Sequence, residues 1–308
     1  MPHFDPLRGC PTARDAFLMT ADPRVVRHSS EFGDWEAVHR SPHSGLAPYV
    51  RRMSGWWERT TFTRRREVPF VGAVLIININ NRLRVSEPTA PERMTSFHAF
   101  FGGLTTSYVV TESSGYGGGI QVDFTPLGAY LFTGVPAHEF ADRVIEYEDF
   151  GGIEARILTD QLESTPNWEE RFELVEAAIL ARMARAPRAS EGVAWAAARL
   201  EAEHGLVSIS ELTRELGWSP RQLIDGFRRE VGLAPKQVAR IHRFDRAVKM
   251  LTPGTSPCFA DIAAACGYYD QAHFAREFRE FAGCTPTQHY ERLVPESGGV
   301  LDDVPGQP

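Results

Sequence analysis

Glycine and proline divide the last hundred residues into short apolar rows at helical spacing, and the same arrangement occurs there twice. In each copy an aliphatic residue stands five positions before a glycine, a phenylalanine follows that glycine by ten or eleven positions, and a second glycine and a proline come next. The copies are residues 209–235 and 259–286, matched at Ile209, Leu212, Gly217, Phe227, Gly232 and Pro235 and at Phe259, Ile262, Gly267, Phe278, Gly283 and Pro286. This correspondence, with one residue inserted in the second turn, indicates a duplicated unit.

Each copy predicts a helix-turn-helix. A short first helix ends at a glycine able to adopt the left-handed C-cap conformation. Ser219 or Asp270 then caps the second helix, and Pro220 suits a first helical position. One face of each second helix is apolar at spacings of three or four, which predicts burial: Leu223, Phe227 and Val231 in the first, and Phe274, Phe278 and Phe281 in the second. Two ordinary helical hairpins with solvated charged faces are the alternative, and the repeat in register favours a pair of recognition helices.

Residues 236–251, between the two copies, predict one connecting helix. Its apolar positions are Val238, Ile241, Phe244, Val248 and Leu251. At the helical rise of about 1.5 Å per residue this helix is roughly 24 Å long. A rigid connection of that length suits two recognition helices that enter the major groove about one DNA turn, roughly 34 Å, apart.

The segments "LGWSPRQLIDGFRREVGLAPKQVARIHRFDRAV" and "IAAACGYYDQAHFAREFREFAGCTPTQHY" resemble the AraC/XylS family of bacterial transcription regulators, over about residues 193–292. The resemblance implies two helix-turn-helix subdomains whose second helices enter adjacent major-groove segments, behind a domain that senses a ligand or mediates dimerisation. It implies base contacts from the early positions of both helices: Ser219, Arg221, Gln222, Asp225, Gln271, Ala272, Ala275 and Arg276. Farther along the helices, Arg228, Arg229 and Arg279 are predicted to contact phosphates.

Asp225 departs from the family pattern, in which a basic residue is common at this position. An aspartate can accept a hydrogen bond from cytosine N4, but it repels phosphate. Ile224 and Gly226 beside it offer no polar group to a base. We therefore expect the first recognition helix to depend mainly on its arginines and on Gln222.

Residues 1–152 predict a β-rich domain. Runs rich in Val, Ile, Tyr and Phe, namely "VGAVLIININ", "TSYVVTES", "GGIQVDF" and "AYLFTG", are separated by glycine clusters such as "GYGGG". Their lengths suit an antiparallel sandwich or small barrel. The stretch 123–152 resembles the cupin-like, jelly-roll-type sensory domains found ahead of AraC-type DNA-binding domains. The predicted fold class is thus α+β multidomain, with a β-rich front domain, a helical linker and an all-α C-terminal domain that holds the two helix-turn-helix motifs.

Three segments follow the predicted front domain. Residues 153–190 are interpreted as a helical linker, and a helix over 167–186 carries an apolar row that packs either on the front domain or on a second copy: Trp168, Phe172, Val175, Ile179 and Met183. Residues 191–293 are the expected DNA-binding domain, and residues 294–308 are expected to be a disordered acidic tail. In the front half, the basic run at 64–66 is interpreted as a solvated loop.

The front half contains few groups that predict ligand chemistry. Trp56, Trp57, Phe100 and Phe101 are candidates for lining an apolar ligand pocket, with packing in the core as the alternative. A metal site would need two or three histidines and a carboxylate that converge from neighbouring strands. The one close pair of histidines, in "HRSPH", is interrupted by a proline. Because a nucleophile elbow and a phosphate-binding loop are also missing, the sequence predicts no metal, no cofactor and no catalytic residue.

Charge is distributed unevenly along the chain, whose formal net charge is −7. Residues 205–293 carry 12 Lys or Arg against 10 Asp or Glu, whereas residues 1–204 carry 21 against 27. A mildly basic module behind an acidic body is compatible with DNA contact by the C-terminal domain. The four cysteines form no C-x-x-C pair, and neither a secretory signal nor an apolar run of membrane length is visible. We therefore expect a cytoplasmic protein that does not contact a membrane.

These patterns favour a sequence-specific DNA-binding transcriptional regulator that is not an enzyme. The expected partners are double-stranded operator DNA, a small-molecule effector or a second copy acting through the front domain, and RNA polymerase if the protein activates. The alternative is a cupin-type enzyme or small-molecule-binding protein whose helical part is an interaction module.

Overall fold

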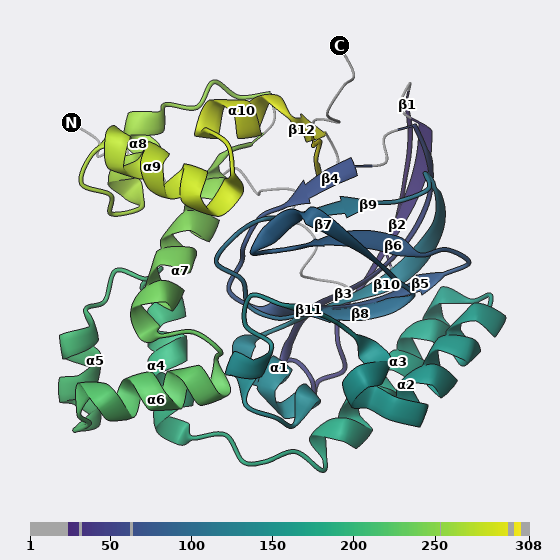
Figure 1. Cartoon of the computed structure of the whole chain (residues 1–308), viewed down its shortest axis with the longest axis horizontal. Helices are drawn as coiled ribbons and strands as arrows, with labels where there is room; N and C mark the ends of the chain where they lie inside the picture. The colour runs from purple at the N-terminus through teal and green to yellow at the C-terminus, as the bar shows by residue number, and fades with distance from the viewer. Residues whose placement is uncertain (1–23, 31–32, 62–63, 253, 295–298, 303–308) are drawn as a thin grey trace, which may run out of the picture.

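The computed structural model describes residues 24–30, 33–61, 64–252, 254–294 and 299–302. Within them, a β-rich front domain occupies one side of the molecule and a helical C-terminal domain lies along the other (Figure 1). This is the predicted division into a β-rich front half and an all-α half. The N-terminal residues 1–23 lie outside the described part of the chain.

The front domain is built on two antiparallel sheets, which confirms the predicted β-rich architecture. In the described chain the larger sheet has the order β1-β2-β3-β10-β5-β8-β11 and the smaller sheet the order β4-β9-β6-β7. The strands are β1 (Arg24–Ser30), β2 (Gly33–Arg40), β3 (Val50–Thr60), β4 (Arg64–Glu67), β5 (Ala73–Ile79), β6 (Leu83–Glu87), β7 (Ala90–Phe97), β8 (Ala99–Gly102), β9 (Val109–Glu112), β10 (Tyr116–Phe124) and β11 (Val144–Glu146).

Helices cover the face of the larger sheet that points away from the smaller one (Figure 1). They are α1 (Pro126–Thr133), α2 (Tyr147–Ser164) and α3 (Trp168–Met183), with the short 3-10 helix η2 (Ala137–Glu139) between α1 and β11. The predicted apolar row of α3 packs on this sheet, since Phe172, Val175 and Ile179 are buried in the same cluster as its strands. The segment interpreted as a linker therefore belongs to the front domain as far as Met183.

The run "AYLFTG" was predicted as a strand, and that prediction is wrong because its capping signals favour a helix. The Thr125 hydroxyl accepts a hydrogen bond from the Gly128 amide, Pro126 occupies the first turn, and Gly134 ends α1 in the left-handed conformation. Phe132 of the run packs in the cluster beneath the sheet, together with Ala129. Aromatic content alone does not distinguish a strand from a buried helix of this length.

The basic run at 64–66 is not a solvated loop, and residues 299–301 of the expected disordered tail are in β-structure, because these two segments pair with each other. Residues 64–66 lie in strand β4, and Leu301 forms an antiparallel bridge with Arg65. The tail continues from the C-terminal domain through β12 (Leu293–Val294) and β13 (Gly299–Val300), which pair with each other. Residues 303–308 of the predicted tail lie outside the described residues.

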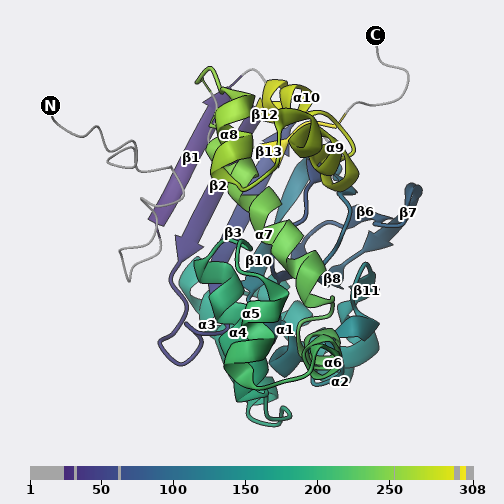
Figure 2. The same ribbon diagram turned by 90° about the vertical axis from the view of Figure 1, so that its left-hand side faces the viewer.

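The C-terminal domain contains the two predicted helix-turn-helix units, one at each end of a connecting helix (Figures 1 and 2). Observed boundaries lie within about two residues of the predicted ones for the connecting helix. The helices are α4 (Glu191–Ala202), α5 (Ile209–Leu216), α6 (Pro220–Glu230), α7 (Pro235–Met250), α8 (Phe259–Ala265), α9 (Gln271–Ala282) and α10 (Pro286–Glu291). The units are α5–α6 and α8–α9, and α7 is the connecting helix.

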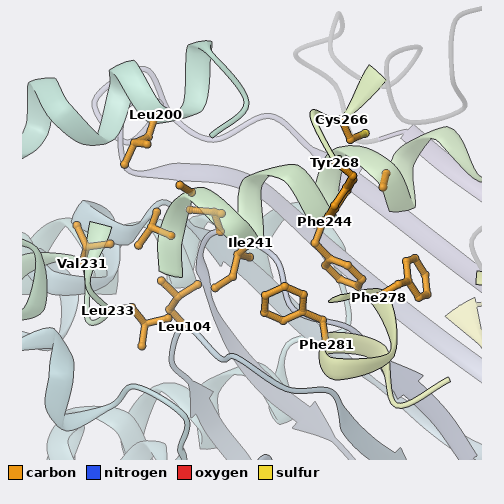
Figure 3. Close-up of a cluster of buried hydrophobic side chains, with 14 of the residues drawn as sticks. Leu104, Leu200, Val231, Leu233, Ile241, Phe244, Cys266, Tyr268, Phe278 and Phe281 are labelled. Carbon is orange, nitrogen blue, oxygen red and sulfur yellow. The ribbon is translucent and has the colours of Figure 1, made fainter. Parts of the chain in front are cut away.

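One apolar cluster joins the two domains. Its members come mostly from α4 to α9, but it also contains Val71 and Leu104 of the front domain. Figure 3 shows Leu104 close to Leu233 and Val231, which follow α6. The C-terminal domain is therefore docked on the front domain through buried apolar side chains.

Candidate DNA-binding surface

The first helix-turn-helix forms as its sequence predicts. Gly217 ends α5 in the left-handed conformation at φ 66°, and the Trp218 amide donates to the Thr213 carbonyl over 3.0 Å to close the turn. Ser219 then caps α6, and Pro220 occupies its first turn. The apolar face of α6 is fully buried against α4 and α7, which leaves the opposite face to solvent.

The polar front of α6 is partly engaged within the helix itself. Gln222 completes a capping box, in which its side-chain carbonyl accepts from the Ser219 amide over 2.9 Å. Arg221 and Asp225, one turn apart, approach to 3.6 Å, with 92% and 63% of their side chains exposed. Asp225 therefore lies beside Arg221, for which the family resemblance implies a base contact. The side-chain amide nitrogen of Gln222 takes part in none of these capping contacts.

The far end of α6 is tied to neighbouring elements. Arg229 pairs with Glu230 at 2.5 Å, and the hydrogen bond to this carboxylate raises the pKa of Arg229. Glu230 is itself fully buried, and its other oxygen accepts from the Ser190 amide at the start of α4 over 2.8 Å. Arg228 is exposed on the outer face of the same turn.

The second helix-turn-helix is held on α7 by both apolar and charged contacts. The Asp270 carboxylate accepts from the His273 amide over 2.6 Å and caps α9. The buried carboxylate of Glu277 pairs with Arg240 of α7 at 2.7 Å. The apolar face of α9 packs on Phe244 of the same helix. These contacts fix which side of α9 faces solvent.

The predicted contact residues lie mostly on the solvent side of α6 and α9. Ala275 is half-buried, and the others are exposed: Ser219, Arg221, Gln222, Asp225, Arg228, Arg229, Gln271, Ala272, Arg276 and Arg279. Within the described residues, no ion pair engages Arg276 or Arg279. The structure thus brings most of the predicted set to the surface of the two helices.

Tyr269 is a candidate that the sequence interpretation missed. The Tyr268 amide donates to the Ala263 carbonyl as the Trp218 amide does to Thr213, so Tyr268 and Trp218 are equivalent. Tyr269 is then the residue inserted in the second turn, and its side chain is 93% exposed directly before the cap of α9. The one-residue insertion between the repeats was the available signal.

Both recognition helices rest on the front domain by their C-terminal ends. After α6, Gly232 lies against the Ala137 carbonyl of η2, where an added Cβ would stand 3.2 Å from that oxygen. At the end of α9, the Ala282 carbonyl accepts a hydrogen bond from Arg66 of β4 over 2.9 Å. The N-terminal halves of both helices carry exposed side chains, among them Arg221 and Gln271, on the side opposite the buried apolar residues.

The four aromatic candidates for a ligand pocket do not line one cavity. Trp56 and Phe100 pack in the cluster between the two sheets, whereas Phe101 lies in the cluster beneath the helices. Neighbouring residues of a strand point to opposite faces. Trp57 packs edge-on against Tyr116.

The glycine cluster before "IQVDF" is part of β10 and accommodates the tryptophans. Gly118 and Gly119 pair with Trp57 and Trp56. A Cβ at either glycine would stand 2.5 Å from the ring of its partner. The glycines therefore provide room for two large rings on adjacent positions of β3.

The front domain has an open groove at one end of the larger sheet. It has a volume of about 530 Å³, and its lining includes Arg27, Trp35, Trp57, Arg59 and Tyr116. A second cavity, of about 10 Å³, lies where Val231 meets the front domain.

In the described chain, no group of three or more His, Cys, Asp or Glu residues could hold a metal ion. None of the described helices is long and apolar enough to cross a lipid bilayer.

Two family models match separate parts of the chain. Residues 212–292 match a helix-turn-helix domain. Residues 38–146 match a domain of unknown function (DUF6597). The first match contains both recognition helices, and the second lies within the front domain.

Individual proteins are similar to parts of the chain or to most of it. An uncharacterized HTH-type transcriptional regulator of Staphylococcus aureus strain MSSA476 is 34% identical over 86 residues, which are 28% of this chain and 11% of that protein. The chain thus matches about a tenth of that relative's length. A probable AraC family transcriptional regulator from Rhodopseudomonas palustris is 30% identical and covers 34% of this chain and 100% of its own, with a TM-score of 0.31. Unsaturated fatty acid-bound ToxT from Vibrio cholerae is 9% identical and covers 86% of this chain and 100% of its own, with a TM-score of 0.47.

The helix-turn-helix match coincides with the duplicated unit found in the sequence and seen in the structure. Both copies have the capped second helix, the buried apolar face and the connecting helix described above. The C-terminal part of the chain, residues 212–292, is therefore a helix-turn-helix domain similar to that of HTH-type transcriptional regulators.

Proposed function

We propose that the protein is a sequence-specific, DNA-binding transcriptional regulator that reads two successive major-groove segments of one duplex. The observation that carries the proposal is the pair of capped recognition helices, anchored by their C-terminal ends on one domain and exposed at their N-terminal halves. The helix α7, of 16 residues, separates them. Such an arrangement suits two contacts on the same face of a duplex.

Base contact is assigned to the early positions of each helix and phosphate contact to the later arginines. Gln271 and Arg276 are exposed on the first two turns of α9. An arginine bound to guanine, or a glutamine bound to adenine, discriminates against the wrong base by about 1–3 kcal/mol. In α6 the side-chain carbonyl of Gln222 is already used in the capping box. To read adenine with both of its polar atoms, Gln222 must give up that contact.

Regulation is assigned to the front domain, in keeping with the core that the two domains share through Leu104. A small molecule, or a second copy of the chain, would change how the recognition helices are presented if it bound one arrangement of the domains more tightly. RNA polymerase becomes a partner if the protein activates transcription.

Selection of bound fragments from random duplexes tests the proposal directly. We expect an enriched site with two conserved segments about one helical turn apart, bound with an affinity that falls as salt rises. Recovery of no enriched sequence, together with a small molecule or metal retained by the purified protein, would instead support the enzyme or binding-protein alternative.

Replacement of Arg276 by alanine tests the base contact. We expect weaker binding to the selected duplex and relaxed preference at one base pair, because the variant loses about 1–3 kcal/mol of discrimination. Competition binding with single-base variants of the site measures both effects. Arg84→Ala removes the same charge from the front domain and should leave both unchanged. An equal loss on specific and random duplexes would show that Arg276 does not read a base.

A further inference from the structure

Arg66 joins three parts of the molecule that are far apart in sequence. It lies in β4 of the front domain, and its guanidinium donates to the Ala282 carbonyl at the end of α9 over 2.9 Å. The same group donates to one oxygen of Asp302 over 3.0 and 2.5 Å. It also stacks on the ring of Tyr108 at 4.4 Å from the ring centre. With 11% of its side chain exposed, Arg66 has little contact with water.

Asp302 is brought to this position by the C-terminal segment that pairs with β4. This strand lies at the edge of the smaller sheet, where its outer backbone groups are open to pairing. Leu301 bridges to Arg65, and the Asp302 amide donates to the Arg64 carbonyl over 3.3 Å. The Asp302 carboxylate also pairs with Arg64 at 3.1 Å and is 6% exposed.

The end of α9 fits closely against the same residues of the front domain. Ala282 is the last residue of the helix, so its carbonyl has no partner within α9. Gly283 follows it with φ at 67°, and an added Cβ would lie 2.1 Å from the Tyr108 ring. Arg66 therefore supplies a donor at the point where the helix end and the front domain come into contact.

We propose that Arg66 is the positioning residue of the second recognition helix, and that Asp302 of the C-terminal segment holds Arg66 in place. The inference rests on the proposed DNA-binding function and adds to it a means of setting the position of one recognition helix. The first recognition helix is held by different contacts, through Gly232 and η2. The two helices are therefore fixed to the front domain independently.

The physical reason is the burial of the Arg66 charge. A guanidinium with so little access to water requires a carboxylate, and removal of that partner leaves an uncompensated charge. The side chain then moves toward solvent and gives up the Ala282 carbonyl. The end of α9 loses its fixed point, and the helix samples a wider range of positions relative to α6.

Asp302→Asn in the full chain tests this without DNA. The variant keeps the shape of the side chain and removes its charge. We expect hydrogen exchange to become at least about fivefold faster in residues 271–291, and to stay unchanged in residues 220–230. Glu112→Gln is the matched control, because it removes a carboxylate from an exposed ion pair with Arg84 in the same domain. Unchanged exchange in 271–291, or equal acceleration in both segments, would overturn the inference.

Arg66→Gln provides an independent check. It should produce the same local increase in exchange, and the double variant should be no worse than either single one, because both substitutions break the same contact. Additive effects of the two substitutions would mean that Asp302 does not act through Arg66.

Binding to DNA gives the second measurement. Against the duplex that wild-type protein selects, Asp302→Asn should lose about fivefold or more in affinity, because the helix must be ordered on binding. On a duplex in which the second conserved segment is scrambled, the variant should differ from the wild type by no more than Glu112→Gln does. The lost negative charge would by itself favour DNA, and Glu112→Gln measures that effect. Equal or tighter binding to the two-segment duplex would refute the positioning role. If the wild type selects no duplex, the proposed function fails, while the exchange experiment still tests the contact.

Discussion

At the scale of single residues, the exposure and the hydrogen bonds of a side chain determine what it can do, and the helical pattern of the sequence shows only part of this. Arg221 and Gln271 are exposed as their positions on the helices predict. The engagement of Gln222 in a capping box and the exposure of Tyr269 are set by the geometry of the turns.

His289 is fully buried, and neither of its ring nitrogens has a hydrogen-bond partner among the described residues. This histidine makes stability depend on pH.

Burial, followed by the charges of Arg66 and Arg292, lowers the pKa of His289 to about 4. An unfolded chain has a histidine pKa near 6.5 and therefore binds the proton first as pH falls. The stability due to neutral His289 is complete above about pH 6.5 and is lost as pH falls from there toward 4. His242, whose pKa burial and Arg51 also lower to about 4, acts in the same direction.

The free energy of unfolding should therefore fall on acidification from pH 7 to 5, by up to about 1.4 kcal/mol per pH unit for each histidine. Urea unfolding at a series of pH values measures the slope. His289→Leu should reduce the slope by the equivalent of about one proton taken up on unfolding. A slope that His289→Leu does not alter would show that this residue does not titrate on unfolding.

At the scale of elements, caps decide where helices begin and end. The glycine and Ser or Asp signals of the two repeats placed α6 and α9 correctly, because a cap acts within one turn of the chain. The same rule, applied to Thr125, Pro126 and Gly134, would have identified α1 where the content of aromatic residues suggested a strand. Local capping carried more information there than composition.

Thr125→Ala should lower the free energy of unfolding by about 1 kcal/mol, since the Gly128 amide loses its acceptor. Chemical denaturation followed by circular dichroism measures the change. Thr125→Ser keeps the hydroxyl and should restore most of the stability. If alanine and serine were equally destabilising, the methyl group and not the cap would be responsible.

At the scale of the whole molecule, the two domains behave as a unit because their contacts are buried and spread over several elements. Leu104 enters the core of the C-terminal domain, and an ion pair of 2.9 Å joins Arg51 of β3 to Glu201 of α4. Both recognition helices contact the front domain directly at their C-terminal ends.

Leu104→Ala should loosen this docking, because the lost side chain leaves a cavity between the domains; the expected cost is about 2–5 kcal/mol. Trypsin cleavage after Arg188, in the segment between α3 and α4, should then become faster. Leu83→Ala is the control, since Leu83 lies between the two sheets and away from the C-terminal domain. Equal acceleration in both variants would mean that general destabilisation, and not loss of docking, exposes the segment.

The sequence by itself determined the features that depend on contacts within a few turns of the chain. These include the duplicated helix-turn-helix, the connecting helix and the apolar rows of α3, α6 and α9, because periodicity and caps are local. Only the tertiary structure decided which surfaces meet: α3 on the sheet, the tail on β4, and Arg66 against Asp302, a pair separated by 236 residues. Strand pairing and ion pairs over such separations depend on how the chain folds back on itself, and a pattern within a few turns of the chain does not specify those long-range contacts.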